Sequence, residues 1–365
     1  MNKSLSIYLD LVRASAALVV FAGHVVLLSG CYAGSGGVGC RFAAGLFPFH
    51  LAHSAVVLFF VLSGYVITYV AAERETRLRD FAVSRFARIY SVAAPAMVLT
   101  LGIDLYLMSV GQTSNIPIYQ YSKLWEYFPM FLTFSNNFWF VSEPTLSDIV
   151  MWSLCYEVWY YVLFASVFYF ERWRRWTLAS LIFAVIGFKL WALLPTWVLG
   201  SIVYKFHRKY DMKPAAARLL FFATLGALLL SFHFTMTSHI DEFVDGMSGG
   251  WISTHMDGSE WFVGDIVIAL LFSANVFAAN FARLEFGRLT APIRLVASFS
   301  FTLYVIHWPL LELLLVYLKI GVVHTIVAVL LSVAALGLVT ERQNHRLRKL
   351  IVNSWGVSRF SYSRN

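Results

Sequence analysis

Long apolar runs alternate with short polar stretches along this chain. Ten runs are predicted to be helices that cross or enter a membrane, because about 20 apolar residues span the hydrocarbon core of a bilayer. The fifth and sixth are shorter than the others and are predicted to pair as a helical hairpin. The ten runs lie near residues 7–29, 51–72, 88–109, 147–170, 177–193, 194–206, 218–235, 263–282, 295–318 and 322–340.

Composition agrees with this pattern. Of the 365 residues, 59% are apolar and 13% are charged, and the mean hydropathy of +0.69 is far above that of ordinary soluble proteins. The sequence therefore predicts an all-α, polytopic integral membrane protein. We expect one transmembrane domain over residues 1–341, followed by a basic cytoplasmic tail over residues 342–365.

The distribution of charge predicts the orientation in the membrane. The net charge is +8, and the basic residues cluster in short loops, which is typical of cytoplasmic loops rather than of a nucleic-acid interface. Placing all these loops in the cytoplasm puts both termini there, and it puts loops 30–50, 110–146 and 236–262 outside. The basic clusters cover residues 73–88, 171–175, 205–213, 283–294 and 341–350.

The first outer loop contains Cys31 and Cys40. The two cysteines are predicted either to form a disulfide in an oxidising compartment or to remain free thiols. The residues LLSGC that end at Cys31 also resemble a lipoprotein cleavage site. Because His24 interrupts the apolar core that a signal peptide requires, we favour an uncleaved first helix.

The first apolar run carries two side chains that are costly in a membrane, Arg13 and His24. Their separation of eleven residues is close to three helical turns, so both lie on one face, about 16 Å apart along the axis. Asp10 is predicted to pair with Arg13. The simpler alternatives are that Arg13 extends toward the cytoplasm and that His24 makes an interhelical hydrogen bond.

Two more ionisable side chains, Glu157 and His307, are predicted to reach the depth of His24. Such groups are unfavourable in lipid unless they meet a partner or water, which favours one shared interior cavity. Pro309 removes a helical hydrogen bond and frees the carbonyl of Val305, as is common where a span lines a cavity. Interhelical hydrogen bonding by Glu157 and simple packing by His307 are the alternatives.

Several motifs together resemble membrane-bound acyltransferase family 3, whose members O-acylate bacterial saccharides. Each motif alone is weak, but their order and spacing from about Ser6 to Thr340 are specific. The chain resembles the stand-alone form of the family, without an extracytoplasmic hydrolase-like domain. The motifs are Arg13 with ten residues before His24, LFFVLSGYVIT at 58–68, RFAR with Arg85 and Arg88, WSLCYEVWYY at 152–161 and LYVIHWP at 303–309.

The resemblance implies an enzyme of a bacterial cytoplasmic (inner) membrane. Its reaction would transfer an acyl group, usually acetyl from acetyl-CoA in the cytoplasm, to a hydroxyl of a saccharide or glycolipid of the cell envelope. A lipid-linked saccharide is the favoured acceptor. Membrane lipid is the other expected partner, and neither nucleic acid nor a metal is expected.

The resemblance also implies roles for individual residues. Arg13, Arg85 and Arg88 are expected to bind the donor, because guanidinium groups form charge-assisted hydrogen bonds with phosphates. His24 is expected to be the general base, with Glu157 orienting it. Direct transfer and an acetyl-His24 intermediate both remain open. Candidates for binding the substrate or the oxyanion are Ser63, Tyr156, Tyr160 and His307.

A polytopic secondary transporter of an envelope saccharide or anionic solute is the alternative function. Transporters also combine about ten spans with ionisable residues near the membrane midplane. The sequence lacks the internal symmetry and the paired interrupted helices that many transporter folds show, which favours the enzyme.

Overall fold

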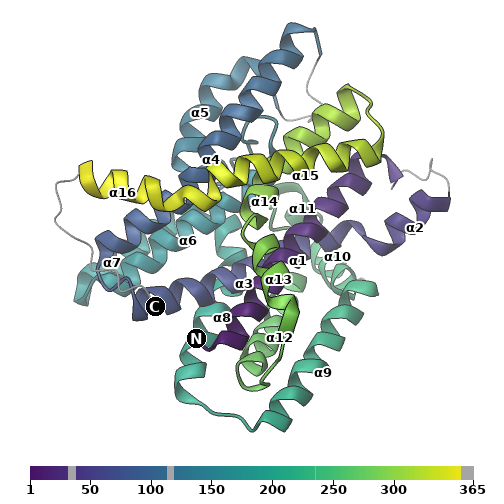
Figure 1. The fold of residues 1–365 in the computed structure, drawn as a ribbon. Coiled ribbons are helices and arrows are strands. Elements are labelled where there is room, and N and C mark those ends of the chain that lie inside the picture. Colours follow the sequence, from purple (N-terminus) through teal and green to yellow (C-terminus); the bar gives the residue numbers. More distant parts are fainter. Residues whose placement is uncertain (32–37, 113–118, 235, 355–365) are drawn as a thin grey trace.

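The computed structural model describes residues 1–31, 38–112, 119–234 and 236–354. Within these residues the regular structure is helical and no β-strand forms (Figure 1). Eight helices in the described part of the chain are long and apolar enough to cross a membrane. The prediction of an all-α, polytopic membrane protein is therefore confirmed.

Ten helices correspond to the ten predicted runs. They are α1 (Lys3–Leu28), α3 (Phe49–Glu73), α4 (Leu78–Ser109), α6 (Trp152–Tyr169), α7 (Arg172–Ile186), α8 (Phe188–Lys209), α9 (Pro214–His233), α12 (Phe262–Phe281), α14 (Ser300–Leu311) and α15 (Val322–Val339).

Helices α7 and α8 form the expected hairpin, but the turn lies at Gly187 rather than near residue 193. Gly187 has a φ of +82°, and a Cβ there would lie 2.6 Å from the backbone N of Trp139. Only glycine combines this conformation with so close an approach. These two helices are not among the eight that qualify as spans by length and composition.

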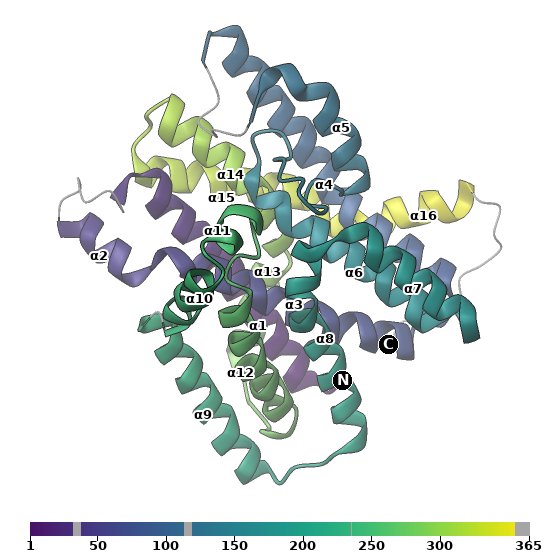
Figure 2. The same cartoon turned by 180° about the vertical axis from the view of Figure 1, so that it is seen from behind.

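Helix α3 lies at the centre of the bundle. It packs against α1, α8 and α12, and α9 packs on the far side of α12 (Figure 2). The crossing of α3 and α8 is close, because a Cβ on Gly64 would lie 1.9 Å from Trp197 O and one on Gly200 would lie 2.0 Å from Val61 O. Two small residues thus let the helix backbones touch.

Helix α14 ends in an irregular segment. Pro309 lies inside its last turn, and a π-helical turn follows over Glu312–Tyr317 before α15 begins. Beyond α15, residues Asn344–Ser354 form α16, which packs against α4. The first part of the predicted tail is therefore a helix, while residues 355–365 of that tail lie outside the described residues.

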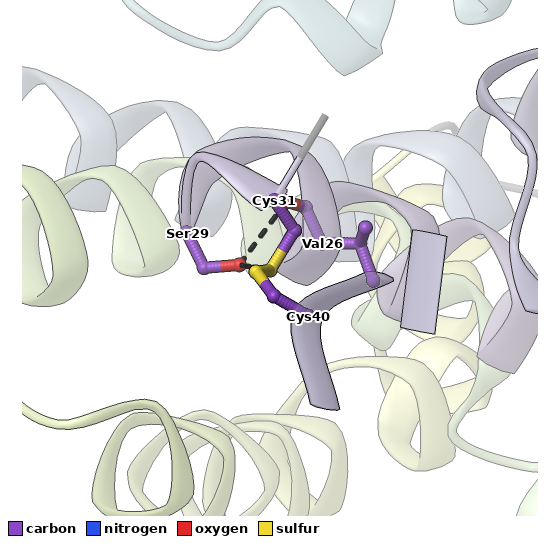
Figure 3. Close-up of a disulfide and its surroundings, with 4 residues drawn as sticks. All are labelled: Val26, Ser29, Cys31 and Cys40. Carbon is purple, nitrogen blue, oxygen red and sulfur yellow. Dashed lines mark hydrogen bonds between the residues drawn. A yellow bond between two sulfur atoms is a disulfide. The ribbon is translucent and has the colours of Figure 1, made fainter. Parts of the chain in front are cut away.

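The loops predicted to be outside contain short helices. They are α2 (Val38–Leu46), α5 (Leu124–Thr133), α10 (Met236–Met247) and α11 (Trp251–His255). Cys31 and Cys40 form a disulfide that ties α2 to the end of α1 (Figure 3). Of the two alternatives for these cysteines, the structure thus has the disulfide. Residues 32–37 between them lie outside the described residues.

Candidate functional site

Two cavities lie inside the bundle, between α1, α3, α6 and α14. The first, which we call the arginine cavity, is lined by Arg13, Arg85 and Arg88 and measures about 100 Å³. The second, the histidine cavity, is lined by His24 and measures about 490 Å³. The sequence predicted one shared chamber, whereas the structure divides the predicted residues between two.

The two cavities adjoin each other. Val56 of α3 and Tyr304 of α14 line both of them. The Tyr304 hydroxyl is held by hydrogen bonds to Ser153 Oγ at 2.6 Å and to Val150 O at 3.2 Å. The Tyr304 side chain is therefore a fixed part of the boundary between the cavities.

His24 is paired with His307. His24 Nδ1 lies 2.8 Å from His307 Nε2, and His307 Nδ1 lies 2.8 Å from the carbonyl oxygen of Leu303. A carbonyl only accepts, so His307 Nδ1 carries a proton and, in the neutral ring, Nε2 accepts a hydrogen bond from His24 Nδ1. This arrangement leaves the lone pair of a neutral His24 on Nε2.

Glu157 does not supply the hydrogen bond to His24 that we expected. It lines the arginine cavity, where it accepts hydrogen bonds from Ser63 Oγ at 3.1 Å and from the Tyr161 hydroxyl. The reason is positional, because α14 presents His307 directly to the His24 ring. Glu157 on α6 belongs to the adjoining cavity instead.

The three predicted arginines differ in their partners. Arg13 bonds to Asp10 at 3.1 Å, which confirms the predicted pair, and to Ala297 O at 3.2 Å. Arg85 is buried and paired with Glu75 at 3.0 Å. Arg88 lines the arginine cavity and forms no ion pair within the described part of the chain.

The candidates for binding the substrate or the oxyanion also separate. Ser63 lines the arginine cavity, and Trp197 Nε1 donates a hydrogen bond to its oxygen at 3.2 Å. Tyr156 and Tyr160 are fully buried, and neither is among the described residues that line the two cavities. The Tyr160 hydroxyl instead donates to Leu190 O at 2.7 Å. Tyr161 and Tyr304 are the tyrosines that line the cavities.

Comparison with known proteins identifies the family. Residues 6–341 match the family model described as an acyltransferase domain. The chain belongs to acyltransferase family 3. It is 26% identical over 240 residues to "Nodulation protein 10" of Rhizobium leguminosarum bv. viciae, over 60% of this chain and 59% of that protein. The match thus spans less than two thirds of that relative. No solved structure matches.

The histidine cavity has a second lining histidine, which the sequence patterns did not single out. His53 lines the histidine cavity, and its Nε2 lies 2.8 Å from Asp265 Oδ2 on α12. Its ring is parallel to Trp152, with centroids 5.6 Å apart. The criterion that singled out His24, an ionisable residue in an apolar run, would also have found His53.

The described residues contain no group of three or more His, Cys, Asp or Glu side chains placed to hold a metal ion. The His53–Asp265 and His24–His307 pairs are thus two separate two-residue groups. Both pairs can hold and orient protons, because each joins an imidazole to a hydrogen-bond acceptor.

Proposed function

We propose that this chain is a membrane O-acyltransferase, most simply an O-acetyltransferase, acting between acyl-CoA and a hydroxyl of an envelope saccharide or glycolipid. One observation carries the proposal. His24, whose bond to His307 directs the lone pair of the neutral ring to Nε2, lines a cavity that adjoins a second cavity lined by three arginines. Membership of acyltransferase family 3 supports the same reaction.

In this proposal the arginine cavity receives the donor. Arg88 is the best placed of the three arginines for a CoA phosphate, because Glu75 already neutralises Arg85 and Asp10 bonds to Arg13. The cavity at about 100 Å³ is small beside the donor, so only part of acyl-CoA would enter it. The thioester would lie toward Tyr304, where the cavities adjoin.

The acceptor hydroxyl would approach from the histidine cavity. Its oxygen attacks the thioester carbonyl carbon while His24 Nε2 takes the hydroxyl proton. The carbon–sulfur bond then breaks, and the departing thiolate takes the proton from the imidazolium, which returns His24 to its neutral form. The His307 hydrogen bond holds the His24 ring in the tautomer that this step requires.

Labelled acetyl-CoA tests this proposal. We expect purified protein in lipid nanodiscs to move the acetyl label onto a hydroxyl of envelope saccharide, and His24→Ala to lower the rate about 10²–10⁴-fold. His239→Ala is the matched control, because that histidine is exposed on α10.

Two results would contradict the proposal. One is full transfer activity in a folded His24→Ala protein. The other is movement of unmodified saccharide across proteoliposomes without any acetylated product, which would favour the transporter.

A further inference from the structure

The wall of the histidine cavity contains two polar atoms that have no hydrogen-bond partner among the described residues. They are Nδ2 of Asn137 and Oε2 of Glu260. Asn137 is only 4% exposed, and a buried polar group without a partner is unfavourable. One atom is a donor and the other an acceptor. A ligand rich in hydroxyl groups, which both donate and accept, would satisfy both.

The segment that carries Glu260 is held firmly in place. Gly258 has a φ of +77°, and a Cβ there would lie 2.8 Å from Cε3 of Trp152, so a glycine lets this segment lie against the indole ring. Ser259 is completely buried. The position of the Glu260 carboxyl is therefore set by packing, as a binding group requires.

Another part of the cavity wall is held by a buried lysine. Lys189 is completely buried, and its Nζ donates hydrogen bonds to Val141 O at 2.8 Å and to Ser142 Oγ. Ser142 lines the cavity a few residues after Asn137. The amine is thus used to anchor this loop.

The size and remaining lining of the cavity fit a sugar ring. Its volume of about 490 Å³ lies within the range of roughly 300–1,000 Å³ that is usual for small-molecule sites. Trp152 and Trp261 add apolar ring surface beside the polar groups.

The charges around the cavity are unevenly distributed. Glu143, Asp257 and Glu260 line it, whereas no lysine or arginine is among its described lining residues. Lys123 offsets Glu143 at 3.3 Å, and His53, which also lines the cavity, is paired with Asp265 at 2.8 Å. Within the described residues Asp257 and Glu260 form no ion pair, although the Lys189 amine lies within electrostatic range of both carboxylates. An anionic group placed there would meet like charge, which disfavours its binding.

We propose that the histidine cavity is an acceptor subsite that selects uncharged sugar residues over uronic acids. Asn137 donates a hydrogen bond to one sugar oxygen, and Glu260 accepts one from a hydroxyl. The carboxylates of Asp257 and Glu260 exclude acidic sugars. This inference rests on the proposed function and adds to it the charge class of the acceptor.

Binding of matched sugars, without any donor, tests the inference. The probes are the methyl glycosides of glucose, galactose and mannose, each paired with its methyl uronide, in calorimetric titrations of the intact protein in nanodiscs. Burial raises the pKa of Glu260, so the titrations are made at pH 8 to keep it ionised. We expect at least one neutral glycoside to bind about tenfold or more tightly than its uronide.

Two substitutions probe the named groups. Asn137→Ala should weaken the binding of the neutral glycoside about 3- to 10-fold. Glu260→Gln keeps the shape of the side chain and removes its charge. It should reduce the ratio of the glycoside affinity to the uronide affinity several-fold. Glu242→Gln is the matched control, because that glutamate is exposed on α10, and it should leave both affinities unchanged.

The inference is overturned if every uronide binds as tightly as its neutral glycoside, or if no glycoside binds at all. It is also overturned if Glu260→Gln leaves the ratio of the two affinities unchanged. These outcomes are distinct from failure of the proposed function. If only the proposed function fails, neutral glycosides bind selectively but no acetyl group passes from acetyl-CoA to any acceptor. Conversely, acetyl transfer to uronides and glycosides at equal rates would refute the inference alone.

Discussion

The hydrogen bond from His24 to His307 fixes which nitrogen of His24 is available for proton transfer. His307 is itself fixed by its bond to Leu303 O, so the orientation passes from the helix backbone through two imidazole rings. At the scale of single residues, this chain of bonds distinguishes His24, which lines the histidine cavity, from His307, which positions the His24 ring.

Substitutions of His307 should separate positioning from catalysis. His307→Gln retains an oxygen that can accept the hydrogen bond from His24 Nδ1, whereas His307→Leu removes the acceptor. We expect the leucine variant to lower kcat about tenfold or more and the glutamine variant to recover much of that loss. Steady-state kinetics with the donor and an identified acceptor measure this difference. Equal loss in both variants, with both folded, would argue against positioning by the hydrogen bond.

The two arginines of RFAR should respond differently to substitution. Arg88→Ala should raise the KM for acetyl-CoA about tenfold or more, because it removes from the arginine cavity a cation that forms no ion pair within the described residues. Arg85→Ala should chiefly lower the melting temperature, since it leaves the buried Glu75 carboxylate without its partner. Arg77→Ala, an exposed residue of the same basic cluster, is the control. An unchanged KM in Arg88→Ala would remove this arginine from the donor site.

At the scale of elements, close contacts between helices set the positions of the cavity walls. Helix α3 supplies Ser63 to the arginine cavity and His53 to the histidine cavity, and its contact with α8 depends on Gly64 and Gly200. Next to this contact, Thr68 Oγ1 donates a hydrogen bond to Ser201 Oγ at 2.7 Å. The glycine crossing therefore fixes the depth and rotation of both site residues.

A methyl group at Gly64 should disturb this crossing. Gly64→Ala places a Cβ 1.9 Å from Trp197 O, so the helices must separate, and we expect a lower melting temperature and reduced transfer activity. Gly102→Ala in α4, where a Cβ meets nothing within 4 Å, is the matched control. It should leave the melting temperature unchanged or raise it slightly. Equal effects of the two variants would show that the crossing tolerates separation.

The junction of α10 and α12 should make stability depend on pH. Asp241 accepts a hydrogen bond from Gly264 N at 2.9 Å, and burial, reinforced by the nearby Asp265 charge, raises the pKa of Asp241 from 3.8 to about 7. A raised carboxyl pKa means that the folded state favours the protonated form. Its contribution to stability is complete below pH 3.8 and is lost as the pH rises through about 7.

Asp241→Asn should remove this pH dependence, since the amide oxygen still accepts from Gly264 but carries no charge. In detergent, we expect the variant to melt at a higher temperature than wild type at pH 8 and to lose most of that advantage by pH 4, close to the ordinary carboxyl pKa of 3.8. Glu242→Gln, on the exposed face of α10, should show no such change. A variant that is less stable than wild type at pH 8 would contradict the assignment.

At the scale of the whole molecule, the bundle separates two chemical environments. Arg85 and Arg88, which belong to a basic cluster, lie at the arginine cavity, whereas Glu143, Asp257 and Glu260, from the loops predicted to be outside, line the histidine cavity. The two cavities share Val56 and Tyr304. This separation supports the proposed arrangement, in which donor and acceptor arrive from opposite ends of the protein.

Labelling of introduced cysteines should reveal the orientation. If the basic clusters are cytoplasmic, Asp211→Cys between α8 and α9 should resist a membrane-impermeant maleimide in intact cells, whereas Ser248→Cys after α10 should react. Both positions are exposed. Cell lysis should make the first position reactive, which provides the control. The opposite pattern would invert the topology and place the arginine cavity away from cytoplasmic CoA.

The sequence by itself determined the fold class, the approximate locations of ten long apolar helices and the pair Asp10–Arg13, because these depend on hydropathy and on spacing within one helix. It also placed Arg13, Arg85, Arg88 and His24 in the segments whose side chains now line the cavities. Depth along a helix, however, does not define rotation about its axis. The sequence therefore predicted a single cavity for His24 and Glu157, whereas helix packing places them in two.

Only the tertiary structure decided which side chains meet. Whether His24 bonds to His307 or to Glu157 depends on how α1, α6 and α14 are rotated against one another, and no local pattern encodes that rotation. Asn137 and Glu260 belong to irregular loops without periodicity. Their side chains line the histidine cavity only because folding brings these loops beside His24. A buried polar atom without a partner can be recognised only once its surroundings are known.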